Sequence, residues 1–250
     1  MKTRQFFILS LIILIPAIPA FTTEVTTGLT YDSANVSFPF GSEFAITETF
    51  EDNSQLSAGL VYKNSGTYRA SFTYSKFLSA AVLSGGFNYD IRTSGISQSI
   101  ALGTGVVLNH FSAIVSGALR LNPADIFSPD MYNCSGDIIF DTKNRIIGLS
   151  FLYSVQKKGA GKENKLGGGV SFTAYEQGAP ADIGVNADVY YVDDKAAGKT
   201  GFAADAGMKI NVYLPFMTIH VKGTADILNP DIASGKNIPF TIGLSTEFKL

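Results

Sequence analysis

The segment TYRASFTYS, residues 67–75, decides the fold class, because its side chains alternate strictly between two kinds. Tyr68, Ala70, Phe72 and Tyr74 are apolar or aromatic, and the residues between them are polar. A period of two places successive side chains on opposite faces of an extended chain, so the segment is predicted to be a β-strand. One such strand does not show which face contacts a protein core and which contacts water.

The same alternation recurs along the rest of the chain, and no amphipathic helix of normal length interrupts it. Small polar connections such as EDNS, NSG and DTKN separate the alternating segments, as is typical of β-hairpins. We therefore predict an all-β, antiparallel, up-and-down meander of about 14 strands, within a range of about 12 to 16. The predicted strands lie near residues 23–31, 43–50, 55–63, 67–75, 79–90, 96–109, 111–121, 135–141, 145–156, 165–176, 182–192, 200–213, 215–225 and 238–250.

The composition excludes several classes of protein. Charged residues make up 16% of the chain, against about 25% in ordinary soluble domains. Apolar residues make up 46%, with 19 Phe and 11 Tyr, which argues against disorder. The net charge of −2 offers no basic face for nucleic acid. Cys134 is the only cysteine, so an intrachain disulfide is impossible.

The N-terminal segment MKTRQFFILSLIILIPAIPA has the features of a secretory signal peptide. Lys2 and Arg4 precede an apolar run, and small residues follow at Ala17 and Ala20. The alternative, an uncleaved anchor, is disfavoured because the run contains two prolines and is shorter than the about 20 residues of a membrane-spanning helix. We expect a signal peptide at residues 1–20 and a single all-β domain at residues 21–250.

The polar face of the strands indicates what each face contacts. It carries mainly Ser, Thr, Gly and Asn, whereas the surface of a soluble sheet carries many Lys and Glu. Small neutral residues suit the interior of a barrel, and the apolar face then contacts lipid. In lipid an open sheet edge leaves backbone groups unpaired, so the sheet must close. A closed transmembrane β-barrel is predicted, and a secreted or periplasmic β-sandwich or β-solenoid is the alternative.

The last predicted strand, PFTIGLSTEFKL, carries the most specific resemblance to a known class. It resembles the C-terminal strand of bacterial outer-membrane β-barrel proteins, with apolar residues at every second position at Leu250, Phe248, Leu244, Ile242 and Phe240. Thr246 departs from this pattern, and Leu250 replaces the frequent final Phe. The resemblance implies that residues 21–250 form a single outer-membrane β-barrel domain. It implies location in the bacterial outer membrane, with both termini periplasmic. It also implies outer-membrane lipid and the barrel-assembly machinery as partners.

Charged side chains on the polar face are the candidate functional residues. Some of them are expected to line a pore and bias which solutes pass. The alternative is that they form ion pairs which fill a narrow lumen. Glu247 and Lys249 also lie on the polar face of their predicted strand. The predicted lumen-facing residues are Lys63, Arg69, Arg120, Asp188, Asp205, Lys209, His220 and Lys222.

The sequence offers no catalytic, cofactor-binding or metal-binding motif. His110 and His220 are the only histidines, and no recognisable spacing pairs either with a nucleophile or a metal ligand. The glycine runs at 103–105 and 167–169 lie inside strand patterns, so they are not phosphate-binding loops. We interpret them as relief of crowding inside the barrel or as bends. We therefore do not expect an enzyme.

The sequence favours a channel or transporter for small solutes. The alternative is a non-transporting surface barrel, namely a structural protein, adhesin or receptor that acts through its extracellular loops. Predicted connections of at most about 13 residues are short for such loops, which favours the channel. The lysine-rich stretch KKGAGKENK, residues 157–165, is interpreted as a solvated loop, and contact with anionic lipid head groups at the cell surface is the alternative.

Overall fold

The computed structural model describes residues 22–34, 39–63, 66–92, 95–121, 129–142, 144–176, 178–228 and 238–249. The predicted signal peptide, residues 1–20, lies outside these ranges. No helix in the described part of the chain is long and apolar enough to cross a membrane. The strands are β1 (Thr22–Asp32), β2 (Phe40–Thr49), β3 (Gln55–Lys63), β4 (Thr67–Leu78), β5 (Ala81–Arg92), β6 (Gly95–Leu108), β7 (Phe111–Leu121), β8 (Met131–Thr142), β9 (Arg145–Lys158), β10 (Gly161–Ala174), β11 (Ala181–Asp194), β12 (Lys199–Tyr213), β13 (Met217–Leu228) and β14 (Phe240–Lys249).

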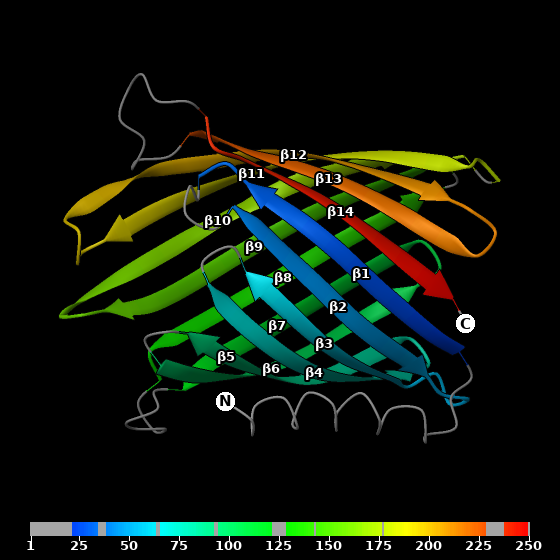
Figure 1. Ribbon diagram of the computed structural model, residues 1–250, viewed down its shortest axis with the longest axis horizontal. Coiled ribbons are helices and arrows are strands. Elements are labelled where there is room, and N and C mark those ends of the chain that lie inside the picture. The colour runs from blue at the N-terminus through cyan, green and yellow to red at the C-terminus, as the bar shows by residue number, and fades with distance from the viewer. Residues whose placement is uncertain are drawn as a thin grey trace.

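The strands form one closed antiparallel barrel in sequence order (Figure 1). Each strand pairs with its neighbours along the chain, and β1 closes the ring against β14 with Leu29 opposite Leu244. The predicted fold class, an up-and-down meander of about 14 strands, is confirmed, and every predicted strand has its counterpart. Closure leaves no sheet edge with unpaired backbone groups, as a lipid environment requires.

The two ends of the barrel differ in their connections. We call the end with Thr22 and Lys249 the terminal end, and the opposite end the loop end. The three longest connections, 33–39, 122–130 and 229–239, all lie at the loop end. Three further connections at the loop end, β5–β6, β9–β10 and β11–β12, are shorter than the alternation in the sequence predicted, because β-pairing continues into the polar segments that flank each turn. The β3–β4 connection has the predicted bounds.

The lysine-rich stretch 157–165 is a hairpin rather than a loop. Lys157 and Lys158 end β9, and β10 begins at Gly161. Gly159 has a φ of +58°, in the left-handed region that a tight hairpin turn requires and that glycine adopts without strain. The interpretation of this stretch as a solvated loop was therefore wrong, because the glycine permits a two-residue turn.

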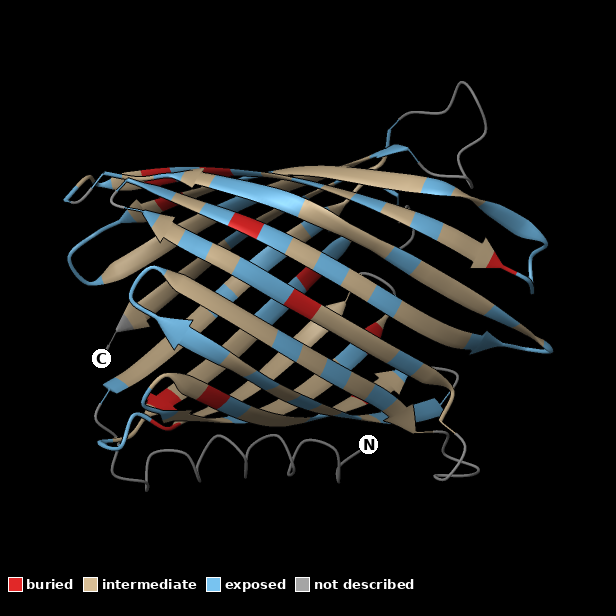
Figure 2. Ribbon diagram, turned by 180° about the vertical axis from the view of Figure 1, so that it is seen from behind, coloured by how far each residue is buried: buried red, intermediate tan, exposed pale blue. Residues whose placement is uncertain are grey.

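The molecule has no dry apolar core in the described residues. Val82 is the only buried hydrophobic residue among them. Large apolar side chains are instead exposed along the strands, among them Leu102, Leu29 and Phe202, at 67%, 63% and 60%. Figure 2 shows exposed positions alternating with less exposed ones along the strands. A soluble β-sandwich would bury these side chains between its sheets, so the arrangement matches a barrel with a lipid-facing apolar surface.

Aromatic pairs gather on the outer face near both ends of the barrel. At the loop end, Tyr31 lies 5.5 Å from Phe40 and 6.0 Å from Phe240 between ring centroids. At the terminal end, the rings of Phe111 and Phe140 lie 5.4 Å apart. Aromatic girdles at the two membrane interfaces are typical of transmembrane β-barrels.

The threonine that interrupts the apolar pattern of β14 has a partner in the structure. Thr246 lies opposite Thr27 of β1, and their hydroxyl oxygens are 3.1 Å apart. Each hydroxyl thereby finds a hydrogen-bond partner on the apolar outer face, which removes most of the cost of placing it there. The polar residue at position 246 is thus paired with a polar residue on β1, where β1 and β14 close the barrel.

Candidate functional site

The polar face of the strands lines the interior of the barrel. The Ser150 hydroxyl of β9 donates to Asp188 Oδ1 of β11 at 3.4 Å, passing over the intervening β10. Lys158 Nζ of β9 likewise reaches Asp194 Oδ2 of β11 at 3.1 Å. Side chains of strands that are not neighbours meet in this way on the concave side of a curved sheet. We therefore call this the inner face.

The strand register places all of the predicted lumen residues on the inner face. Asp188 lies opposite Asp205, and Lys209 lies opposite Lys222. His220 lies opposite Asn211, which shares the inner face with Asp182. The side chain of Lys249 lies outside what the structure describes. The inner-face set is Lys63, Arg69, Arg120, Asp188, Asp205, Lys209, His220 and Lys222.

A basic cluster lies on β3–β5 toward the loop end, formed by Lys63, Arg69 and Arg92 around Asp90. Arg69 donates to both carboxylate oxygens of Asp90, with Nε–Oδ1 at 2.6 Å and Nη2–Oδ2 at 2.8 Å. Arg92 Nη2 lies 3.6 Å from Asp90 Oδ2. Lys63 is within electrostatic reach of Arg69, Asp90 and Arg92. Only 5% of the Asp90 side chain is exposed, so its charge is held almost entirely by protein groups.

Two other inner-face cations at the loop end are matched by carboxylates. Arg120 Nε lies 2.6 Å from Asp130 Oδ1, in the segment that leads into β8. Lys158 pairs with both Glu163 and Asp194. Each of these cations therefore has at least one full negative charge beside it.

A row of three carboxylates crosses β11, β12 and β13, and we call it the carboxylate row: Asp188, Asp205 and Asp226. Asp205 lies directly opposite both of the others. Lys165 is the nearby cation, and its Nζ lies 3.7 Å from the centroid of the Tyr190 ring. The row gives this part of the wall a negative character.

The glycine run at 167–169 makes room for this part of the wall. A Cβ on Gly169 would lie 1.9 Å from Asp188 Oδ1, and a Cβ on Gly167 would lie 2.6 Å from the Tyr190 ring. The side chains of β11 therefore lie flat over β10, as the interpretation of the glycines as relief of crowding predicted. Flat side chains leave the interior less filled.

His220 belongs to a hydrogen-bonded network near the terminal end. Asn211 Nδ2 donates to Asp182 Oδ1 at 2.7 Å, which leaves Asn211 Oδ1 to accept from His220 Nδ1 at 2.7 Å. The Tyr213 hydroxyl also donates to Asp182. His220 Nε2 lies 3.9 Å from Glu247 Oε2. The imidazole is thus held between an amide and a carboxylate from the two neighbouring strands.

No spacing in the sequence joins His220 to these partners, because the contacts depend on strand register. The alternation in the sequence could have identified three further inward-facing residues, namely Asp90, Asp182 and Asn211. Which inward residue lies opposite which is set by turn length and pairing, and a shift of two residues would join different partners.

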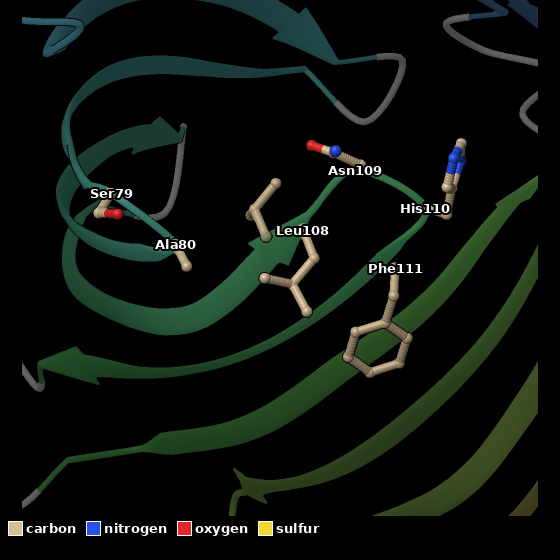
Figure 3. Close-up of a pocket in the computed structure, with 7 residues that line it drawn as sticks. Ser79, Ala80, Leu108, Asn109, His110 and Phe111 are labelled. Atoms are coloured by element: carbon tan, nitrogen blue, oxygen red, sulfur yellow. The ribbon is translucent and has the colours of Figure 1, made fainter.

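A hollow on the surface lies between the turns β4–β5 and β6–β7 at the terminal end (Figure 3). His110 is the one titratable residue in its lining, and no carboxylate or thiol accompanies it. Its lining consists of Ser79, Ala80, Val107, Leu108, Asn109, His110 and Phe111. Elsewhere in the described ranges, no group of three or more His, Cys, Asp or Glu residues is arranged to hold a metal ion.

One turn at the terminal end is tied to a strand by an ion pair. Asp52, between β2 and β3, accepts hydrogen bonds from Lys76 of β4 and from the backbone N–H of Ser54, the latter at 2.9 Å. The hydrogen bond from Lys76, followed by those from Ser54, holds the pKa of Asp52 well below its ordinary range. The charged form of Asp52 therefore ties this turn to β4.

Solved structures with the same architecture come from bacterial outer membranes. OmpT of Vibrio cholerae matches with a TM-score of 0.54 at 8% identity, over 92% of this chain and 96% of that chain. A bacterial polysaccharide outer membrane secretin matches with a TM-score of 0.56 at 8% identity, over 93% of this chain and 100% of that chain. The chain has the fold of bacterial outer-membrane β-barrels.

The structure named NanC porin is also similar, with a TM-score of 0.51 at 12% identity, over 91% of this chain and 100% of that chain. At these identities the likeness establishes the fold alone. By sequence, no protein-family model matches the chain, and no curated protein matches it either. The inner face is therefore the basis for assigning a function.

Proposed function

We propose that this protein is a diffusion channel for small hydrophilic solutes in the bacterial outer membrane. The observation that carries the proposal is the inner wall, which combines small polar residues with charges of both signs. Opposite the carboxylate row, the wall of β3–β7 is built at mid-height from residues such as Gly59, Ser71, Gly103 and Ser116. Residues of this size occupy little of the interior.

The size of the barrel supports an open lumen. Barrels of about 8 strands are filled by their own side chains, whereas those of about 16–18 strands leave an aqueous channel. This barrel has fourteen strands, closer to the second group. Backbone proximity is limited to neighbouring strands of the ring among the described residues, and the hydrogen bonds that pass over a strand, such as Ser150–Asp188, stay within one wall.

The pair Lys209 and Lys222 supports a hydrated interior. The two lysines are directly opposite each other on β12 and β13. Like charges in this position repel and are destabilising in a dry environment. Water in the lumen would screen this repulsion.

The proposal extends to export, assembly and partners. The segment 1–20 would direct export and be removed, and the barrel-assembly machinery would recognise β14 through its apolar alternation, from Phe240 to Phe248. The apolar outer face would contact outer-membrane lipid, and the loop end would face the cell exterior. We assign no catalytic role to His220, since it is engaged by Asn211 at Nδ1 and faces Glu247 at Nε2. We assign no nucleic-acid partner, because the net charge of −2 offers no basic face.

Single-channel recording of the refolded mature chain in a planar bilayer tests the proposal. Discrete and stable openings with ohmic conductance are the expected result. A correctly folded and inserted barrel that never conducts would overturn it. That outcome would favour a surface barrel that acts through its extracellular loops.

A further inference from the structure

The basic cluster differs from the other charged groups at the loop end in its balance of charge. Lys63, Arg69 and Arg92 contribute three positive charges and Asp90 contributes one negative charge, which leaves a net charge of +2. Arg69 occupies both carboxylate oxygens of Asp90. The single carboxylate is therefore largely committed to one of the three cations.

The two remaining cations are available to a ligand. Arg92 approaches Asp90 only at 3.6 Å, and 42% of its side chain is exposed. Lys63 is half-buried and, within the described residues, makes no ion pair. By contrast, Arg120 and Lys158 at the same end have their own carboxylates. The basic cluster on β3–β5 thus carries an excess of positive charge that Arg120 and Lys158 do not.

A second observation marks the same place. Ser97 of β6 lies directly opposite Asp90. Its hydroxyl oxygen is buried and has no hydrogen-bond partner among the described residues. Among the described side chains it is the only buried polar atom in that state. A hydroxyl without a partner is destabilising, and an additional acceptor beside Asp90 would relieve it.

From these observations we propose that the basic cluster is a binding site for the anionic group of a solute in the lumen, with Lys63 and Arg92 as its charged ligands. Arg92 provides a planar donor fork suited to a carboxylate or phosphate, and Lys63 adds a second point of positive charge. Asp90 is a positioning residue that holds Arg69 against the wall. This inference rests on the proposed function, because it names the solute class that enters the channel.

The test measures equilibrium binding of succinate to the refolded barrel in detergent micelles by isothermal titration calorimetry. Low ionic strength is needed because salt screens exposed charges. Succinamide, which has the same shape without the charge, serves as the control ligand. The double variant Lys63→Gln/Arg92→Gln should bind succinate at least about tenfold more weakly, the effect of losing one charge-assisted hydrogen bond.

Lys158→Gln is the matched control variant, because it removes a lysine from the same end that already has two carboxylate partners. It should leave succinate affinity within about twofold of the wild type, because its ion pairs already neutralise it. The site is refuted if folded wild-type barrel fails to bind succinate or binds succinamide equally well. It is also refuted if Lys158→Gln weakens binding as much as the double variant does. Strand content by circular dichroism verifies the fold of each variant.

Failure of the site and failure of the channel are separate outcomes. Binding in micelles does not depend on conduction, so a silent barrel that binds succinate would refute the channel and support the site. A conducting barrel whose current is interrupted equally by succinate in wild type and double variant would support the channel and refute the site.

Discussion

Arg69 of β4 and Asp90 of β5 form a bidentate ion pair on the inner face, with N–O distances of 2.6 and 2.8 Å. The Asp90 side chain is nearly buried, so its charge depends on Arg69. Arg69→Glu would place a second carboxylate against it. We expect this variant to lose up to about 3 kcal/mol of unfolding free energy, as for a broken buried pair. Urea titration followed by circular dichroism measures the loss.

Arg92→Glu is the control for that experiment. It makes the same change of charge at the inward position of β5 that follows Asp90. Arg92 is more exposed and lies 3.6 Å from Asp90. Its replacement should cost less than about 1 kcal/mol, as expected for an exposed ion pair. Equal losses in the two variants would show that total charge, rather than the bidentate contact, determines stability.

Phe72 and Ser71 test the assignment of the two faces. Phe72 is on the outer face, opposite Phe87, and Ser71 is its inward neighbour. Phe72→Arg should destabilise the inserted barrel by about 2–4 kcal/mol, the cost of arginine near the bilayer midplane. Ser71→Arg should cost much less, because its guanidinium reaches water in the lumen. If Ser71→Arg were the more harmful change, the faces would be reversed.

The fold was predicted well from the sequence because each strand of a barrel alternates apolar and polar residues, a pattern that is local in the chain. The alternation at Tyr68, Ala70, Phe72 and Tyr74 identifies both the strand and its outer face, and no long-range information is needed. Strand ends were less accurate where polar residues continue the pairing, as at Lys158 and Gly161. A solvated hairpin and a solvated loop have the same composition, so hydropathy does not separate them.

The contacts on the inner face were less accessible to prediction. That Arg69 faces inward follows from alternation, but its pairing with Asp90 requires the register of β4 against β5. The network around His220 requires the register of β11, β12 and β13 together. Register is set by turn geometry and cross-strand packing, which one sequence encodes only weakly.

The pair Lys209 and Lys222 offers a stabilising substitution. The two lysines are directly opposite each other on the inner face. Lys222→Glu replaces repulsion with attraction and should increase the unfolding free energy by about 0.2–1 kcal/mol. The gain should decrease as salt is added, because screening weakens both interactions. A gain that does not change with salt would mean that charge is not its cause.

The turn around Asp52 predicts a dependence on pH. Its pKa is lowered in the folded protein by the hydrogen bond from Lys76. A carboxyl with a depressed pKa stabilises the fold above its unfolded pKa of about 3.9, and this contribution is lost as the pH falls further. Asp52→Asn should therefore be less stable than the wild type at neutral pH, and the difference should shrink in acid. An unchanged difference at low pH would contradict the ion pair.

Gly169 tests whether the flat packing of Asp188 is required. Alanine there would place its Cβ 1.9 Å from Asp188 Oδ1 and 2.8 Å from the Ala187 carbonyl oxygen. Asp188 would have to leave its hydrogen bond with Asn186 Nδ2, now 2.8 Å long. Gly169→Ala is expected to cost about 1–3 kcal/mol, as for other overpacked sites.

Gly223→Ala is the matched control, because nothing lies within 4 Å of the Cβ it would add. Its effect should stay within about 0.5 kcal/mol. The double variant Gly169→Ala/Asp188→Ala should cost less than the sum of its single variants, because the displaced carboxylate is then absent. Strict additivity would show that the added Cβ clashes with the Ala187 carbonyl oxygen instead. Glycine at position 169 would then be needed for backbone packing rather than for the Asp188 side chain.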